Sequence, residues 1–129
     1  MSIQNCIPKD KYDVPATDRA GELGFPSLNE AIPDLLEWLQ DANWPVAEPI
    51  ASIMQYAGTE IVPHIRKILA GQDQEWKWAI IVLVVARSSP EVICDLQDEL
   101  LRLAHSPSEG EKRAGVDGVA QEVVHEHLV

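Results

Sequence analysis

The stretch EAIPDLLEWLQDANWPVA, residues 30–47, is repeated in altered form thirty residues later as EIVPHIRKILAGQDQEWKWA, residues 60–79. The matched pairs include Glu30 and Glu60, Ile32 and Val62, Pro33 and Pro63, Leu35 and Ile65, and Leu39 and Leu69. The apolar residues of each copy recur at the spacing of one helix face, and each proline stands in the first turn, where it removes few hydrogen bonds. Each copy therefore predicts a helix, with Asn29 and Thr59 as its N-cap.

The second half of each copy predicts a turn followed by another helix. Residues 41–47 and 73–79 share the order Asp, two residues, Trp, one residue, an apolar residue and Ala. A helix, a turn and a second helix repeated every thirty or so residues is typical of an α-solenoid. The helix expected over 75–87 is apolar on nearly every side, so we place it in the middle of the stack.

The ends of the chain complete this picture. Residues 90–129 predict a third, divergent helix pair. Ser89 caps its first helix, and Ser108 with Glu111 forms a capping box for a last helix that ends near Val124. Residues 1–26 predict an extended arm and a short helix outside the repeat. At 129 residues we expect one all-α domain: the arm over 1–26 and about three helix pairs over 27–129.

The repeat resembles HEAT-like repeats, an α-α superhelix. The residues that carry the resemblance are Pro33, Leu36, Leu39, Asp41, Val46 and Ala47, and then Pro63, Leu69, Asp73, Trp78 and Ala79. Ala stands after the apolar residue of the second helix in both copies, where HEAT units commonly carry Arg. IPKDKYD at 7–13, LEWLQDANWPVA at 36–47 and WKWA at 76–79 also resemble an uncharacterised bacterial family of unknown function. That resemblance implies a helical fold and no established activity.

The charge of the chain argues against two classes of partner. Lys and Arg total 10 against 21 Asp and Glu, a formal net charge of −11. Such a chain repels nucleic acid and anionic membrane surfaces. The most apolar run, residues 79–86, is too short to span a bilayer, and the N-terminus shows no signal peptide. Cys6 and Cys94 match no disulfide framework and are expected to be reduced. We therefore expect a cytoplasmic protein, and the family resemblance implies a bacterial one.

Catalytic and metal-binding patterns are weak. Glu122 and His125 have the Glu-x-x-His spacing of half a di-iron site, but a second copy is absent. His125 and His127 are two residues apart and would point apart on a helix. The sequence contains neither a phosphate-binding Gly-rich loop nor a nucleophile elbow. We expect no metal, no cofactor and no enzymatic activity.

The tryptophans are the best candidates for binding residues. Trp44 and Trp76 occupy the same repeat position, which is explained either by packing between successive helix pairs or by exposure in a groove. In a groove they would be binding anchors, with Asn43, Glu48 and Lys77 as neighbours. Both interpretations stay open at this point.

Charge distribution favours an interaction role. Residues 27–57 contain five acidic residues and no Lys or Arg, and residues 89–129 contain nine acidic and three basic residues. The leading hypothesis is a protein-interaction module for a basic partner, such as an immunity protein that neutralises a basic, nucleic-acid-degrading toxin. The alternatives are a small-molecule-binding or enzymatic domain with a Trp-lined pocket, and a purely structural accessory domain. Homo-oligomerisation through the ends of the stack is also compatible with the sequence.

Overall fold

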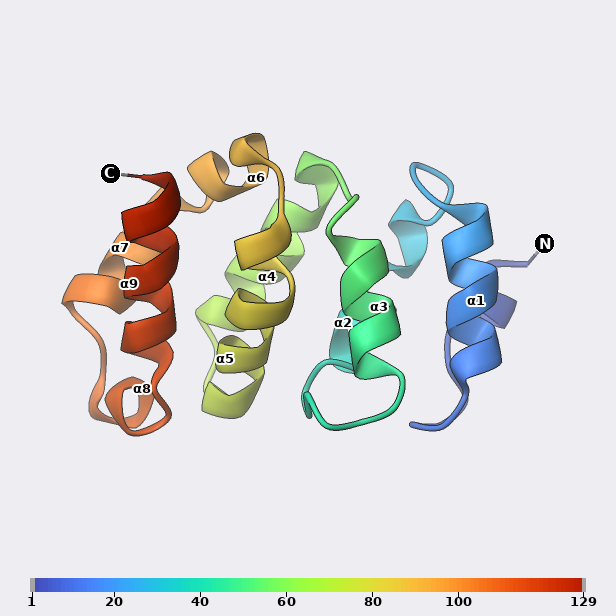
Figure 1. The fold of residues 1–129 in the computed structure, drawn as a ribbon, viewed down its shortest axis with the longest axis horizontal. Helices are drawn as coiled ribbons and strands as arrows, with labels where there is room; N and C mark the ends of the chain where they lie inside the picture. The colour runs from blue at the N-terminus through green and yellow to red at the C-terminus, as the bar shows by residue number, and fades with distance from the viewer. Residues whose placement is uncertain (1, 129) are drawn as a thin grey trace.

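Regular structure in residues 2–128, the part that the computed structural model describes, consists of helices and 3₁₀ turns, with no strand in that range. The all-α prediction is confirmed. In chain order the elements are η1 (Ile3–Cys6), α1 (Val14–Leu23), η2 (Asn29–Ala31), α2 (Ile32–Glu37), α3 (Ala47–Met54), η3 (Thr59–Ile61), α4 (Val62–Leu69), α5 (Gln74–Leu83), η4 (Val85–Arg87), α6 (Pro90–Asp95), α7 (Gln97–His105), α8 (Glu109–Arg113) and α9 (Val116–His127) (Figure 1).

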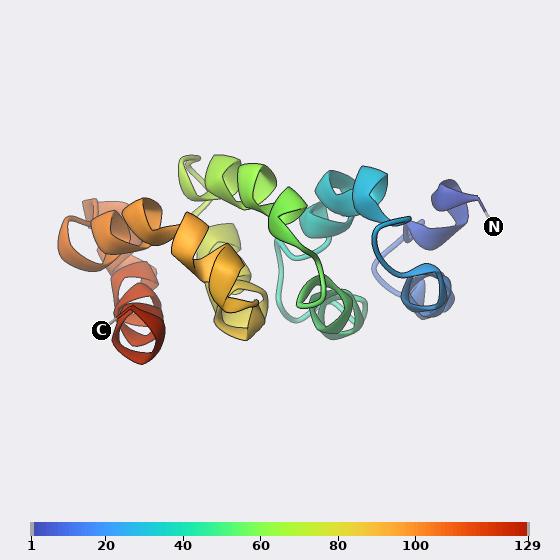
Figure 2. The same cartoon turned by 90° about the horizontal axis from the view of Figure 1, so that it is seen from above.

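The helices form two layers that run from one end of the molecule to the other. Figure 2 shows α1, α3, α5 and α9 along one side and α2, α4 and α7 along the other. The core lies between the layers as one continuous cluster of buried residues. This arrangement agrees with stacked helix pairs, and its assignment to the HEAT-like class stays a prediction.

The N-terminal segment packs against the end of this stack. Helix α1 contacts α3, and η1 contacts η2. Cys6 and Ala20 are fully buried members of the common core cluster. Residues 2–26 thus extend both layers by one partial pair, while the proposed boundary after residue 26 stays a prediction.

The two repeat copies begin in the same way, but later than predicted. Asn29 and Thr59 each open a 3₁₀ turn instead of capping an α-helix. The α-helices begin at Ile32 and Val62, and neither has a side-chain cap. The prolines that follow stand at the first or second helical position, where the missing N–H costs nothing.

The shared aspartates act differently in the two copies. Asp73 caps α5 by accepting a 3.1 Å hydrogen bond from the N–H of Trp76. Asp41 instead accepts from the N–H of Asn43 at 2.8 Å within a turn, and α3 begins only at Ala47. Pro45 explains the later start, because a proline disfavours helical backbone at the residue before it.

Helix α5 lies in the middle of the stack, as its all-round apolar sequence predicts. It contacts α3, α4 and α9. It ends at Leu83, before the expected residue 87, and a 3₁₀ turn completes the segment.

The C-terminal helix pair contains more interruptions than predicted. The helix that opens at Pro90 is interrupted at Leu96, and the last helix is interrupted at Gly115. Gly115 has a φ of 78°, a left-handed conformation that glycine adopts without steric cost. The capping box of Ser108 and Glu111 is confirmed at the start of α8.

Candidate functional site

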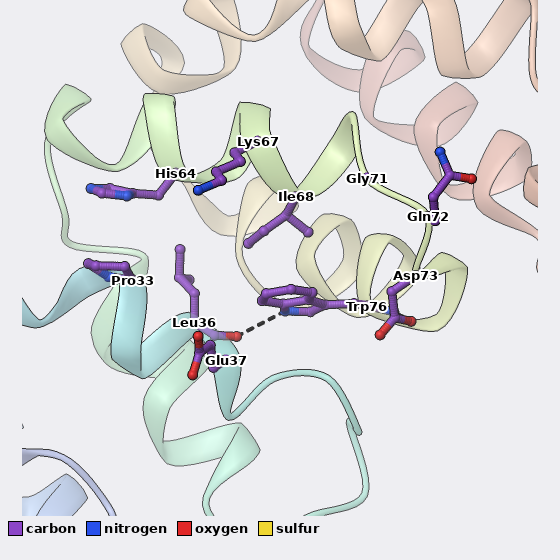
Figure 3. A pocket seen from close by; sticks show the side chains of 10 residues that line it. All are labelled: Pro33, Leu36, Glu37, His64, Lys67, Ile68, Gly71, Gln72, Asp73 and Trp76. Atoms are coloured by element: carbon purple, nitrogen blue, oxygen red, sulfur yellow. Dashed lines mark hydrogen bonds between the residues drawn. The ribbon is translucent and has the colours of Figure 1, made fainter.

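A groove of about 390 Å³ opens between the neighbouring helices α2 and α4. Its base is the indole of Trp76, which reaches it from α5 (Figure 3). The residues that give the groove its character are Leu36 and Glu37 of α2, His64, Lys67 and Ile68 of α4, and Trp76. We call this the Trp76 groove.

Two hydrogen bonds hold Trp76 at the base. Its backbone N–H donates to Asp73, and its indole Nε1–H donates to the carbonyl oxygen of Leu36 at 2.9 Å. Leu36 stands in the last turn of α2, and its carbonyl also accepts a 3.1 Å hydrogen bond from the N–H of Leu39. The indole is therefore a further donor to this carbonyl, and it remains half-buried, with its ring next to Leu36 and Ile68 (Figure 3).

Charged side chains of both signs border this apolar base. Glu37 lies on the α2 side and Lys67 on the α4 side, where the imidazole of His64 also lines the groove (Figure 3). Lys67 is exposed and forms no ion pair with any residue in 2–128. Its neighbour Arg66 is engaged, because it pairs with Glu99 at 2.6 Å and donates to the Asp95 carbonyl at 2.8 Å. Lys67 is thus a cation that a ligand in the groove can use.

A second hollow, of about 440 Å³, lies beside the first turn of α5. Its main lining residues are Asp41 and Asn43 of the turn after α2, Glu75 and Trp78 of α5, and Ala114 after α8. We call this the Trp78 hollow. It differs from the Trp76 groove in lacking a lysine, arginine or histidine among its lining residues.

The structure separates the five residues predicted to share a binding surface. Trp76 lines the groove and Asn43 lines the hollow. Trp44 packs edge-on against Trp38, with ring centroids 5.6 Å apart. The equivalent tryptophans therefore have different surroundings: one packs on a neighbouring ring, and the other forms the base of a groove.

Both charged residues of the predicted binding set form ion pairs within the protein. Glu48 forms a bidentate ion pair with Arg87 at 2.7 and 3.2 Å, which lowers the pKa of Glu48 and raises that of Arg87. Lys77 is buried, and its ammonium lies 2.7 Å from Glu111. The expectation that Lys77 stands beside the tryptophans on an exposed groove is wrong, because its helix turns this position toward α8.

Glu111 is the centre of a buried ion network. It accepts two hydrogen bonds from Arg102 at 3.0 and 2.8 Å, one from Lys77, and one from the Ser108 N–H at 2.7 Å. The hydrogen bonds from Arg102, followed by those from Lys77 and Ser108, hold the pKa of Glu111 far below its usual range despite burial. The capping-box pattern in the sequence identifies Glu111 as a helix-capping residue. No local pattern indicates that it also pairs with Lys77.

Metal-binding and membrane-spanning features can be assessed for residues 2–128. Within them no three His, Cys, Asp or Glu side chains lie close enough together to hold a metal ion. No helix in the same range has the length and apolarity needed to cross a bilayer.

The fold and these two depressions define a small all-α protein of layered helix pairs with preformed surface hollows. Residues 6–124 match the model of the family described as Domain of unknown function (DUF5071). The chain belongs to this family, which agrees with the expected resemblance to an uncharacterised family. A search of the curated proteins gives no match.

Proposed function

We propose that this protein is a protein-interaction module and that its partner inserts an apolar side chain into the Trp76 groove. The observation that carries the proposal is the half-buried indole of Trp76 at the base of an open groove with charged borders. Such a combination is typical of interface hot spots, where a central apolar anchor is surrounded by polar residues that exclude water.

The groove is preorganised for binding. The Trp76 indole is held by the Leu36 carbonyl, so its ring needs no reordering when a ligand arrives. Fewer side chains to immobilise means a smaller entropic cost of association. An apolar side chain placed on the ring would contact Leu36 and Ile68 at the same time, because all three line the groove.

The charge of the chain supports a basic partner. The net charge is −11, and several of the basic residues are already paired with carboxylates, among them Arg66, Arg87 and Arg102. An uncompensated acidic surface accelerates association with a basic protein. In its specific form, the proposal is an immunity-type role in the bacterial cytoplasm, in which the partner is a basic, nucleic-acid-degrading toxin.

The second candidate is a small-molecule-binding domain that uses the same groove. Glu37, His64 and Lys67 all line the Trp76 groove, and a small-molecule site uses a few such polar groups beside an apolar surface. A small ligand with an apolar body and both charges would satisfy them. The strongly acidic net charge of the chain favours a basic protein over a small zwitterionic ligand.

Affinity capture with a matched pair of variants tests the proposal. Ile68→Glu places a charge beside Trp76, and Ile53→Glu makes the same change at a half-buried position of α3 outside the groove. We expect the wild type and Ile53→Glu to retain one basic protein from lysate of the source cell at low salt. Ile68→Glu should retain it at least tenfold less, the loss expected at a hot spot.

Each outcome is informative once circular dichroism shows that both variants are folded. Equal retention by all three proteins would remove the groove from the interface. Absence of any retained protein, together with a thermal shift of the wild type by a small zwitterionic ligand, would favour the small-molecule candidate.

A further inference from the structure

The Trp78 hollow has a chemistry of its own that the proposed groove does not use. It is formed where three parts of the chain meet: the turn after α2, the start of α5 and the junction of α8 with α9. These three parts lie along the same lower edge of the molecule in Figure 1. The sequence analysis named Asn43 of this hollow but not Trp78, Asp41 or Glu75 as its partners.

Two carboxylates give the hollow a negative charge. Asp41 and Glu75 are both exposed, and neither forms an ion pair with any residue in 2–128. The Oδ1 atom of Asp41 is engaged by the N–H of Asn43, which fixes the turn. The nearest basic residue along the chain to Ala114 is Arg113, which is exposed and is not among the lining residues.

An aromatic ring adds the second element of a cation site. Trp78 is half-buried and lines the hollow. The face of an indole attracts cations, and guanidinium groups most often occupy such positions in proteins. A guanidinium is planar and can stack on the ring while its N–H groups reach carboxylates, which an ammonium does less well.

We propose that the Trp78 hollow receives an arginine side chain of the protein partner. The guanidinium lies against Trp78, and Asp41 and Glu75 neutralise its charge. For the identity of the ligand, this inference rests on the proposed function, a basic protein partner. The groove binds the apolar anchor and the hollow binds the cation, since only the groove carries Lys67, whose ammonium repels a guanidinium.

A titration with short peptides tests the assignment without any partner protein. The probes are acetyl-Gly-Arg-Gly-amide, its citrulline counterpart, which has the same shape without the charge, and its lysine counterpart. The readout is the NMR signal of the Trp78 indole N–H, identified by its loss in Trp78→Phe. We expect the arginine peptide to shift this signal, the lysine peptide to bind more weakly, and the citrulline peptide to leave the signal unchanged.

Two double variants separate the site from the general acidity of the surface. Asp41→Asn/Glu75→Gln removes both charges and keeps an oxygen at position 41 that accepts from the Asn43 N–H. Asp34→Asn/Glu60→Gln removes two exposed charges from the first turns of α2 and η3. We expect the first to weaken arginine binding about fivefold, as for the loss of two exposed ion pairs. The second should leave it within a factor of two.

The assignment is overturned if citrulline or lysine binds as well as arginine, or if both double variants lose affinity equally. Shifts confined to other indole signals would overturn it as well. Its failure is distinguishable from failure of the proposed function, because the capture experiment depends on Ile68 and this titration does not.

Discussion

The ammonium of Lys77 lies 2.7 Å from a carboxylate oxygen of Glu111, 34 residues further along the chain, and both side chains are almost completely buried. This ion pair joins α5 to α8. Arg102 of α7 and the Ser108 N–H complete the hydrogen bonds of the same carboxylate. A single residue therefore ties the middle of the stack to its C-terminal pair.

Removing the charge of Glu111 should destabilise the fold strongly. Glu111→Gln leaves Lys77 buried without a counter-ion, and breaking a buried pair in this way costs about 3 kcal/mol or more. Lys77→Met removes the buried ammonium itself and leaves Glu111 with Arg102, so it should cost clearly less. Urea unfolding monitored by circular dichroism measures both. A larger loss for Lys77→Met would contradict this account.

The same carboxylate should make stability depend on pH. Its pKa is lowered in the folded state, mainly by the hydrogen bonds from Arg102, so the unfolded chain takes up the proton first as the pH falls. The stabilisation is complete above the unfolded pKa of about 4.3 and is lost progressively below it. Asp13 and Glu48, whose pKa values are also lowered, act in the same direction.

Unfolding free energies measured from pH 7 down to pH 3 check this prediction. The wild type should lose stability below about pH 5, and Glu111→Gln should lose less over the same range. An equal slope for the two proteins would show that Glu111 is not a principal titrating group.

The indole hydrogen bond of Trp76 should contribute to stability as well as shape the groove. Trp76→Phe keeps an aromatic ring but removes one donor to the Leu36 carbonyl, which retains the Leu39 N–H, at a cost of about 0.5–1.5 kcal/mol. In the wild type, the Nε1 proton of Trp76 should exchange slowly with deuterium. Trp78→Phe is the control, and equal stability losses for the two variants would argue against a specific contribution of this bond.

Two glycines near the C-terminus should respond in opposite directions to alanine. Gly115→Ala forces a left-handed backbone on a residue with a Cβ, and should destabilise by about 1 kcal/mol. Gly118 lies inside α9 with open space around its Cβ position, so Gly118→Ala should stabilise by roughly 0.5–1 kcal/mol. Thermal unfolding of the pair checks both signs, and a shift in the same direction would contradict the conformational explanation.

Local signals predicted most of the helices correctly. The spacing of Ile32, Leu35 and Leu36 predicts α2, and all three residues are buried. The predicted helix boundaries are less accurate where the sequence contains no clear helix-breaking or capping signal. The interruption at Leu96 has no proline or glycine to mark it, and the 3₁₀ turns at Asn29 and Thr59 occupy positions that equally suit an α-helix cap.

The candidate site was predicted only in part. Trp76 was recognised from its repeated position, but its groove partners His64, Lys67 and Ile68 were not. The sequence predicts an exposed Lys77, because a lysine on a helix is usually exposed. No nearby sequence pattern indicates its buried ion pair with Glu111.

The sequence by itself determined the all-α class and the places of most helices, since apolar spacing and prolines act over a few residues. Tertiary structure alone decided that Trp44 packs on Trp38 while the equivalent Trp76 forms the base of a groove. It also decided that Lys77 faces Glu111 across the core. The physical reason is that the surroundings of a side chain depend on which segments pack beside it, and the partners of Trp76 and Lys77, which are Leu36 and Glu111, lie 40 and 34 residues away in the chain.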